Sequence, residues 1–195
     1  RALIWVDSRY FVQCADQIKG TSFEMRKIDG PEATSPIDFL AENFRDGKKV
    51  GISAETLMIS AMEKYSRKGI SIIATDDLLN NIWPDRPAMP ENPVESLDDS
   101  LTGMSIQEKI CKLRELGHQK GEDYQLVSSL DDIAWILNLR GNDIADTPVF
   151  LAHLLIGPSA VKLFTPIARF KDTEIEGFEV LPYDAVGGEL SSLKD

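Results

Sequence analysis

Four prolines lie within residues 83–95, near the middle of the chain, and they limit its fold more than any other feature of the sequence: Pro84, Pro87, Pro90 and Pro93. A proline inside a helix removes a backbone hydrogen bond, and its ring clashes with the preceding turn, so no helix can cross this stretch. The 195 residues would fit one sizeable domain or two small ones. We therefore predict a linker over residues 83–104 between a first domain (residues 1–82) and a second domain (residues 105–195).

Before the linker, short apolar segments alternate with amphipathic ones. Residues 2–6, 23–28, 50–52 and 69–74 are typical of buried strands, and the segments between them have apolar residues at helical spacing. In the first of these helices, Cys14 lies on the apolar face and is predicted to be a core residue. This alternation favours an α/β layer with mostly parallel strand pairing.

The helices of the first domain carry recognisable end signals. Ser35 is a predicted N-cap, Pro36 follows at the first helical position, and Gly47 is a predicted stop. In the next helix, Met58 and Met62 are predicted to face inward together with Tyr65.

After the linker, Ser105 and Glu108 have the spacing of a capping box and predict the start of a helix. Ser129 with Asp132 is predicted to cap a second, shorter helix. Strands are expected over residues 124–127, 149–156, 160–164 and 178–181, whereas Gly187 and Gly188 are expected to form a turn. The fold class that we predict is α/β, with mixed, largely parallel sheets flanked by helices.

The two halves contain similar segments. Residues 2–11 resemble residues 160–170, and residues 22–28 resemble residues 177–183. We interpret this as a duplicated domain, with both copies incomplete because the matched segments lie at opposite ends of the chain. The alternative is that any two apolar strands look alike.

The charge balance argues against two classes of partner. The chain has 32 acidic and 21 basic residues, a net charge of -11, which repels nucleic-acid phosphates and anionic lipid surfaces. Its longest apolar runs are far shorter than the ~20 residues of a membrane-spanning helix. Cys14 and Cys111 lie far apart without metal-ligand spacing, which suits a reducing compartment, so we expect a cytoplasmic protein.

The sequence offers no catalytic or metal-ligating constellation. His118 and His153 are its only histidines, and neither has neighbours with metal-ligand spacing. We expect His118 to lie near a helix C-terminus and His153 to be a hydrogen-bonded histidine of the core or sheet edge. Nucleophile-elbow and phosphate-binding glycine motifs are absent as well. We therefore predict no catalytic residue, no metal site and no cofactor in this chain.

Three segments, in order, resemble the amino-terminal region of three-domain Xaa-Pro aminopeptidases (aminopeptidase P) of the creatinase/prolidase superfamily. Residues 5–11 (WVDSRYF) are similar to the family's Trp-Thr-Asp-Gly-Arg-Tyr-Phe, and residues 81–87 (NIWPDRP) resemble its interdomain linker. The most specific segment comprises residues 130–143 (LDDIAWILNLRGND) and continues to residues 148–150. The resemblance spans nearly the whole chain.

The resemblance implies what a longer parent protein would do. In that family a third, carboxy-terminal domain holds two divalent metals, usually manganese, and a metal-bound hydroxide removes the N-terminal residue that precedes proline. No segment of this chain resembles that domain. The amino-terminal domains have related α/β folds, help to form a homodimer and wall the substrate channel, which admits short peptides with proline at the second position.

The same resemblance places Asn138, Arg140 and Asp143 nearest the channel, with Arg140 organising the loop through carboxylate bonds. The alternative is a purely structural turn, in which Gly141 is required by the backbone and Asp143 acts as a cap. For the chain as a whole, one alternative is a stand-alone interaction module with the same fold and no peptidase activity. Another is a superfamily relative that acts on a non-peptide substrate such as creatine.

Overall fold

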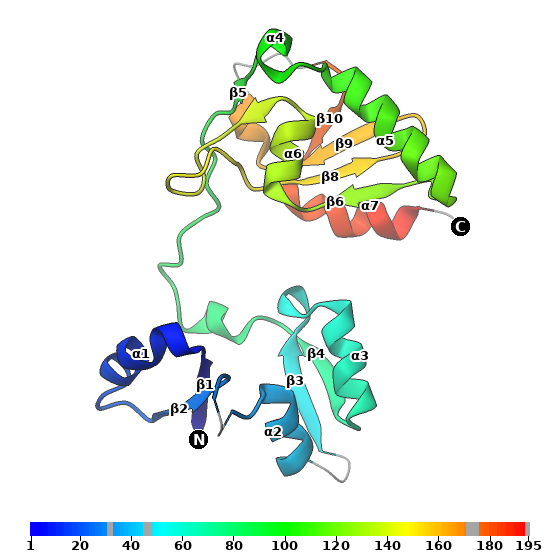
Figure 1. The fold of residues 1–195 in the computed structure, drawn as a ribbon. Coiled ribbons are helices and arrows are strands. Elements are labelled where there is room, and N and C mark those ends of the chain that lie inside the picture. Colours follow the sequence, from blue (N-terminus) through cyan, green and yellow to red (C-terminus); the bar gives the residue numbers. More distant parts are fainter. Residues whose placement is uncertain (31–32, 45–47, 171–175, 194–195) are drawn as a thin grey trace. The chain divides into compact units, whose positions relative to one another are not determined.

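The computed structural model describes residues 1–30, 33–44, 48–170 and 176–193. The chain forms two compact units, Arg1–Arg86 and Pro87–Asp195 (Figure 1). The predicted stop at Gly47 lies outside the described residues. Within the described part, every helix is too short or too polar to span a membrane.

The first unit contains two separate pairs of strands, each with a helix in the connection. Its elements are β1 (Ala2–Val6), α1 (Phe11–Gln17), β2 (Phe23–Lys27), α2 (Pro36–Asn43), β3 (Lys49–Ser53), α3 (Ile59–Arg67) and β4 (Ser71–Thr75). Strand β1 pairs with β2, and β3 pairs with β4, both in parallel. Short 3-10 turns cover Ser8–Tyr10, Ala54–Thr56 and Leu78–Asn81.

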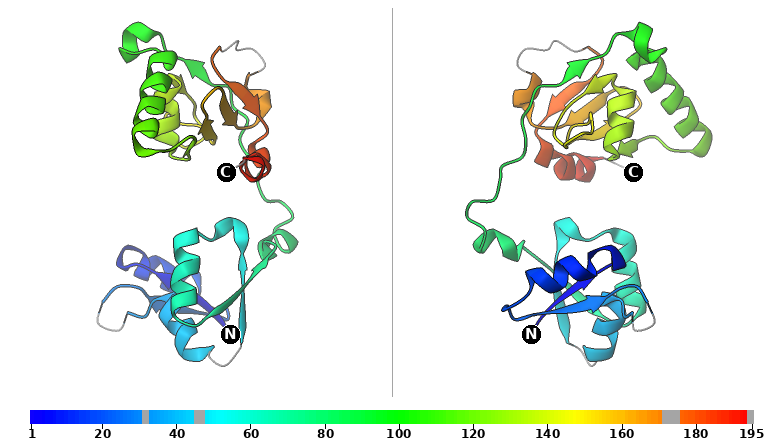
Figure 2. Two further views of the ribbon diagram at one scale, coloured as in Figure 1. Left: turned by 90° about the vertical axis from the view of Figure 1, so that its right-hand side faces the viewer. Right: turned by 60° about the vertical axis from the view of Figure 1, so that its left-hand side comes forward.

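The second unit is built on a four-stranded sheet with the order β10-β9-β8-β6. Its elements are β5 (Glu95–Ser96), α4 (Asp99–Thr102), α5 (Ile106–Lys120), β6 (Gln125–Val127), α6 (Leu130–Ile136), β7 (Leu139–Arg140), β8 (His153–Ile156), β9 (Val161–Phe164), β10 (Glu179–Leu181) and α7 (Val186–Ser192). Helices α5 and α7 lie on opposite sides of the sheet, as the left view of Figure 2 shows. The short strands β5 and β7 pair separately.

The prediction of largely parallel sheets is correct for the first unit and wrong for the second. In the four-stranded sheet only β10 and β9 are parallel, whereas β8 is antiparallel to both β9 and β6. The connection between β8 and β9 comprises only residues 157–160. A connection this short can form a hairpin but cannot carry the chain back for parallel pairing.

The hydrophobic core lies in the second unit. Its buried members come from α5, α6, the sheet and the segments between them, and include Ile110, Ile133, Phe150 and Leu163. In the described part of the first unit, only Cys14 and Ile70 are buried hydrophobic residues. The core position predicted for Cys14 is thus confirmed.

The inward orientation predicted for two methionines is wrong. Met58 is 72% exposed and Met62 is 54% exposed. Met62 lines an open groove of about 420 Å³, together with Leu57, Ile59 and apolar residues of β3 and β4. The apolar face of α3 is therefore only partly covered within this unit.

Local end signals account well for the long helices. Ser105 Oγ accepts a hydrogen bond from the Glu108 N–H (3.3 Å), and the Glu108 carboxylate accepts one from the Ser105 N–H (2.8 Å), which confirms the capping box. Ser35 caps α2 as predicted. Ser129 is the N-cap residue of α6, as predicted, but its side chain makes no capping hydrogen bond.

Two other local predictions are also wrong. Gly187 and Gly188 lie inside α7 and form no turn. The strand expected over residues 149–156 begins only at His153.

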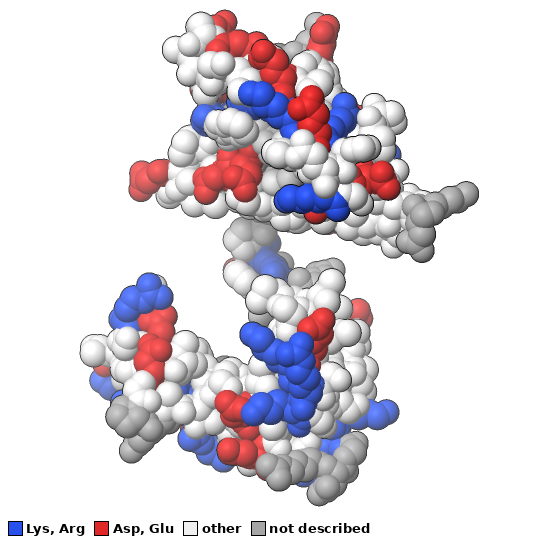
Figure 3. Space-filling model, turned by 45° about the vertical axis from the view of Figure 1, so that its right-hand side comes forward, with Lys and Arg blue, Asp and Glu red and all other residues white. Residues whose placement is uncertain are grey.

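Acidic and basic side chains are interspersed on the face drawn in Figure 3, on each of the two units. Ion pairs on the surface of the first unit include Arg67 with Glu63 (2.9 Å) and Lys68 with Asp38 (3.0 Å). The net charge of -11 is therefore not gathered into one patch on this face.

Candidate functional site

Two of the predicted site residues, Asn138 and Arg140, lie where helix α6 ends and the chain enters β7, and Asp143 lies in the loop after β7. Asn138 has a left-handed backbone conformation, with a φ angle of 50°, and its side chain is 1% exposed. Its amide nitrogen donates hydrogen bonds to Asp99 Oδ1 (3.1 Å) and to the Met104 carbonyl (3.0 Å). Asparagine adopts this conformation more easily than most residues. Asn138 therefore joins the end of α6 to α4 and to the segment before α5.

Lys109 of α5 completes this cluster. Its side chain is buried, its ammonium group donates hydrogen bonds to Asn138 Oδ1 and to the Trp135 carbonyl, and it lies 4.2 Å from the centre of the Trp135 ring. Burial lowers the pKa of Lys109, the nearby Arg140 charge lowers it further, and Asp99 opposes both. A cation near the last carbonyls of a helix interacts favourably with the helix dipole, so Lys109 fastens α5 to the end of α6.

Arg140 acts through carbonyl groups, so its predicted bonds to carboxylates are wrong. Its Nη1 donates to the Ala134 carbonyl (2.9 Å) and to the Leu139 carbonyl (2.8 Å). Ala134 lies in the last turn of α6, where carbonyls have no partner within the helix. Arg140 therefore satisfies the end of this helix, and its side chain remains partly exposed.

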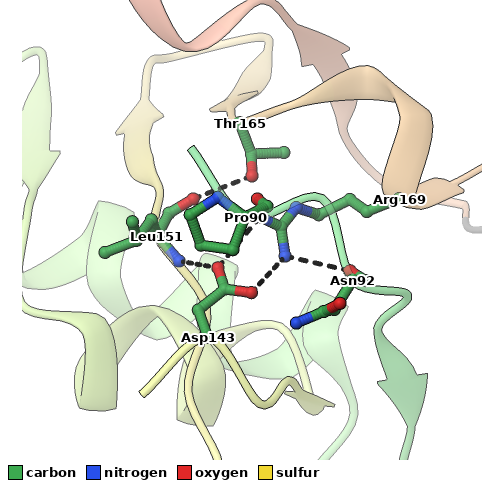
Figure 4. A network of polar contacts seen from close by, with 6 residues as sticks. All are labelled: Pro90, Asn92, Asp143, Leu151, Thr165 and Arg169. Atoms are coloured by element: carbon green, nitrogen blue, oxygen red, sulfur yellow. Dashed lines mark hydrogen bonds and ion pairs between the residues drawn. The ribbon is translucent and has the colours of Figure 1, made fainter. Parts of the chain in front are cut away.

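Asp143 belongs to a different network (Figure 4). Its Oδ2 lies 2.9 Å from Nη2 of Arg169, and both side chains are 0% exposed. The same carboxylate accepts a hydrogen bond from the Leu151 N–H (2.7 Å). Arg169 also donates to the carbonyls of Pro90 (2.8 Å) and Asn92 (3.2 Å). This ion pair therefore connects the proline-rich segment to the loop after β7 and to the 3-10 turn Ile167–Phe170.

The backbone around this pair explains why β8 begins late. The Gly141 N–H donates to the Pro148 carbonyl and the Asp143 N–H donates to the Val149 carbonyl, so these residues pair with the loop. A Cβ atom at Gly141 would lie 2.7 Å from the Cβ of Phe150. Glycine is needed here for a close approach of two chain segments.

The three predicted site residues do not converge on one point. Asn138 and Asp143 belong to separate networks, and both are buried with their polar atoms bonded within the protein. Sequence analysis missed Arg169 and Lys109, which pair with them. The two partners of the ion pair are 26 residues apart, and the Lys109–Asn138 pair is 29 residues apart, so no local spacing indicates either contact.

The two histidines lie in different parts of the second unit. His153 Nδ1 lies 2.8 Å from Ser128 Oγ, and its ring lies 4.9 Å from the Tyr183 ring. Burial lowers the pKa of His153. His118 lies in the last turn of α5, as predicted. In residues 1–30, 33–44, 48–170 and 176–193, no group of three His, Cys, Asp or Glu side chains could hold a metal ion.

Comparisons with known proteins agree with this architecture. The profile of the "Creatinase/Prolidase N-terminal domain" family matches residues 85–195. A "Probable Xaa-Pro aminopeptidase P" from Laccaria bicolor is 34% identical over 99% of this chain and 31% of its own length. "Xaa-Pro aminopeptidase 2" from Homo sapiens is 33% identical over 87% of this chain and 26% of its own length.

A solved structure is similar as well. The X-prolyl aminopeptidase of Caenorhabditis elegans, described as a cytosolic enzyme with a di-nuclear active site, matches with a TM-score of 0.84 and 27% identity. The match covers 97% of this chain and 32% of that protein. The chain thus spans between about a quarter and a third of the length of these relatives.

Proposed function

This chain belongs to the creatinase/prolidase N-terminal domain family, and we propose that it is the non-catalytic amino-terminal part of a proline-specific metallo-aminopeptidase. One observation carries the proposal: the chain matches Xaa-Pro aminopeptidases along nearly its whole length, in sequence and in fold. The substrates of the parent enzyme would be short peptides with proline at the second position. Its location would be the cytoplasm, where the related nematode enzyme is described.

The metal chemistry belongs to another part of the parent. The described residues do not fit a metal centre, because they contain no cluster of three ligand-type side chains and His153 is already bonded to Ser128. Two divalent ions, manganese by family resemblance, would therefore be held by the catalytic domain. This chain would contribute architecture, namely part of the homodimer and of the wall of the substrate channel.

The loop around Arg140 is the part of this chain that we assign to the channel wall. Asn138 and Asp143 are buried and fully bonded, so their role is to hold the loop in place. Arg140 uses one terminal nitrogen on the end of α6 and is only partly buried. Its guanidinium could therefore also contact a peptide in the channel.

We further propose that the two units, Arg1–Arg86 and Pro87–Asp195, are related copies of one domain. The linker predicted over residues 83–104 is shorter than expected, because β5, α4 and the buried Val94 belong to the second unit. Each unit has a parallel strand pair whose first strand is followed by a 3-10 turn. The strand registers support the duplication. The pair Leu3 and Glu24 of β1 and β2 corresponds to the pair Lys162 and Glu179 of β9 and β10. Likewise, the pair Trp5 and Arg26 corresponds to the pair Phe164 and Leu181.

The strand registers align the first pair of similar segments one residue differently from the sequence comparison. In the sequence comparison Ala2 is equivalent to Ala160, whereas the strand registers make Ala2 equivalent to Val161. An experimental structure in which residues 2–44 fail to superpose on residues 160–193 would refute the duplication.

The function is tested by comparing this chain with its parent protein. We expect the parent to release the first residue of an Xaa-Pro peptide in the presence of manganese, and to lose this activity with a chelator. The chain alone should show no turnover. Chelator-sensitive turnover by the isolated chain would refute its non-catalytic role.

Arg140→Ala in the parent tests the channel assignment. We expect a raised KM for the peptide if Arg140 contacts substrate. If the variant is less stable but its kinetics are unchanged, Arg140 only organises the loop. If both kinetics and stability are unchanged, Arg140 neither contacts the substrate nor organises the loop.

A further inference from the structure

A cleft of about 450 Å³ lies in the second unit, between the C-terminal half of α5 and the strands β6 and β8. Pockets that enclose small ligands commonly have volumes of ~300–1,000 Å³. The lining of this cleft combines charged groups of both signs with apolar groups: Arg114, Glu115, Glu122, Asp123, Ile156 and Pro158. None of its lining residues belongs to the candidate site described above.

The inner surface of the cleft is apolar and held in place by the fold. Ile156 of β8 is 2% exposed, and Pro158 follows it in the connection to β9. Gln125 of β6 forms part of the wall, and its amide nitrogen donates a hydrogen bond to the Leu113 carbonyl (2.6 Å). A Cβ atom at Gly117 would clash with this nitrogen in its bonded position. An apolar group of a ligand therefore meets a surface that is already formed.

Arg114 provides a fixed positive charge in this lining. Its Nε donates a hydrogen bond to the Gly157 carbonyl (2.8 Å), which holds the guanidinium against the turn after β8. Among the described residues, no carboxylate forms an ion pair with Arg114, and its two terminal nitrogens have no hydrogen-bond acceptor. Terminal guanidinium nitrogens bind carboxylates well. Arg114 is therefore available for the carboxylate of a ligand.

The carboxylates of the lining are unpaired as well. Glu115, Glu122 and Asp123 are exposed, and none of them has an ion pair within the described part of the chain. Glu122 and Asp123 follow Gly121, whose left-handed conformation (φ of 76°) ends α5. At the rise of an α-helix, this end lies ~10 Å along the axis from Arg114. The cleft thus has a cation at one position and two carboxylates about two helical turns away.

From this arrangement we propose that the cleft binds a short zwitterionic peptide with an aliphatic side chain. The peptide carboxylate binds to Arg114, and its ammonium group lies near the carboxylates that follow α5. Two or three extended residues span ~7–10 Å, which suits the spacing of these charges. The aliphatic side chain packs on Ile156, where burial of apolar surface adds to the affinity. The carboxylates repel a simple anion and Arg114 repels a simple cation, so both ends of the peptide contribute.

Titration with the dipeptide Ala-Leu, followed by the backbone amide NMR shifts of this chain, tests the proposal. We expect saturable shifts at Gln125 and Ile156 with a Kd of ~1 mM, the affinity usual for a ligand this small. N-acetyl-Ala-Leu lacks the ammonium charge, and Ala-Leu amide lacks the carboxylate. Each should bind about tenfold more weakly, because one charge-assisted interaction is lost.

A double variant tests which carboxylates receive the ammonium group. Glu122→Gln with Asp123→Asn should weaken the binding of Ala-Leu about tenfold and should not weaken that of N-acetyl-Ala-Leu. Asp131→Asn with Asp132→Asn is the matched control, because it makes the same change of charge at exposed positions of α6 outside the cleft. The control should leave both affinities unchanged. The blocked peptides keep the proposal testable should a variant fail to fold.

No saturable shift at Gln125 and Ile156, at concentrations well above the expected Kd, would overturn the proposal. Equal affinities for Ala-Leu and its amide would also overturn it, because the cleft would then bind cations in general. Equal affinities for Ala-Leu and its acetylated form would do the same in favour of anions. These measurements report binding alone, so they stand or fall separately from the peptidase test of the proposed function.

Discussion

Arg169 and Asp143 form an ion pair with an N–O distance of 2.9 Å, and both side chains are completely buried. The guanidinium also donates to the Pro90 and Asn92 carbonyls, and the carboxylate accepts from the Leu151 N–H. Removing charges from water is costly, and these hydrogen bonds offset much of that cost, although Nε of Arg169 is buried without a partner among the described residues. Four segments of the second unit therefore depend on one pair of side chains.

Asp143→Asn should lower the free energy of unfolding of the second unit by about 3–5 kcal/mol, because it leaves the Arg169 charge buried without a counter-ion. Urea unfolding followed by the fluorescence of Trp135 would measure this. Glu63→Gln, which breaks the exposed pair with Arg67, is the control and should leave the midpoint unchanged. The double variant Asp143→Leu, Arg169→Met should cost less than the sum of its single changes. An additive double variant would contradict the coupling.

Lys109→Met should destabilise the second unit by about 1–3 kcal/mol, because it leaves the Trp135 carbonyl and Asn138 Oδ1 without their donor. Lys112→Met, at an exposed position of the same helix, controls for the change in helix composition. Thermal unfolding of the two variants would separate the effects. Equal midpoints would show that the ammonium group contributes nothing to the α5–α6 contact.

Ser105→Ala should cost about 1 kcal/mol, because it removes the hydroxyl that accepts from the Glu108 N–H. Ser129→Ala is a matched control at a helix start without a side-chain cap bond, and it should cost clearly less. Chemical denaturation of both variants gives the comparison. A Ser129→Ala variant as unstable as Ser105→Ala would contradict the assigned roles.

The stability of the second unit should decrease as the pH falls below about 6.5, the ordinary pKa of histidine. Burial lowers the pKa of His153 in the folded protein, so below that pH the unfolded chain binds a proton before the folded chain does. The loss should stop once the pH falls below the folded pKa. The ring is surrounded by the Ser128 hydroxyl and by Tyr183, whose pKa is raised by burial and by Asp184.

His153→Gln should flatten this dependence, and His118→Gln should keep it. Unfolding midpoints measured between pH 5 and 8 would show the difference. If the unfolding midpoint of His153→Gln still falls with pH as in the unmodified protein, another titratable group causes the dependence.

The parts of the fold that follow from short-range patterns could be predicted from the sequence. The capping box at Ser105, the N-cap at Ser35 and the buried Cys14 each depend on residues a few positions apart. The sense of the β8–β9 pairing could have been inferred from the short connection, but alternating strands and helices suggested parallel pairing instead.

The partners of the candidate site could not be predicted in this way. The sequence around Asp143 indicates a polar loop, yet the charge that it neutralises lies 26 residues later, and only the packed sheet brings the two together. The inward orientation of Met58 and Met62 was predicted wrongly for a different reason. Helical spacing identifies an apolar face but does not specify what covers it.

The contacts of Arg169 with the Pro90 and Asn92 carbonyls also bear on where the chain can be cut. A shortened fragment that starts at residue 105 would lose both acceptors, together with the buried Val94 and the hydrogen bond from the Leu97 N–H to the Asn138 carbonyl. A fragment that starts at Pro87 keeps all of them. We therefore expect limited proteolysis to yield a stable product that retains Pro90, and recombinant fragments that begin after Asn92 to be recovered mainly as aggregates.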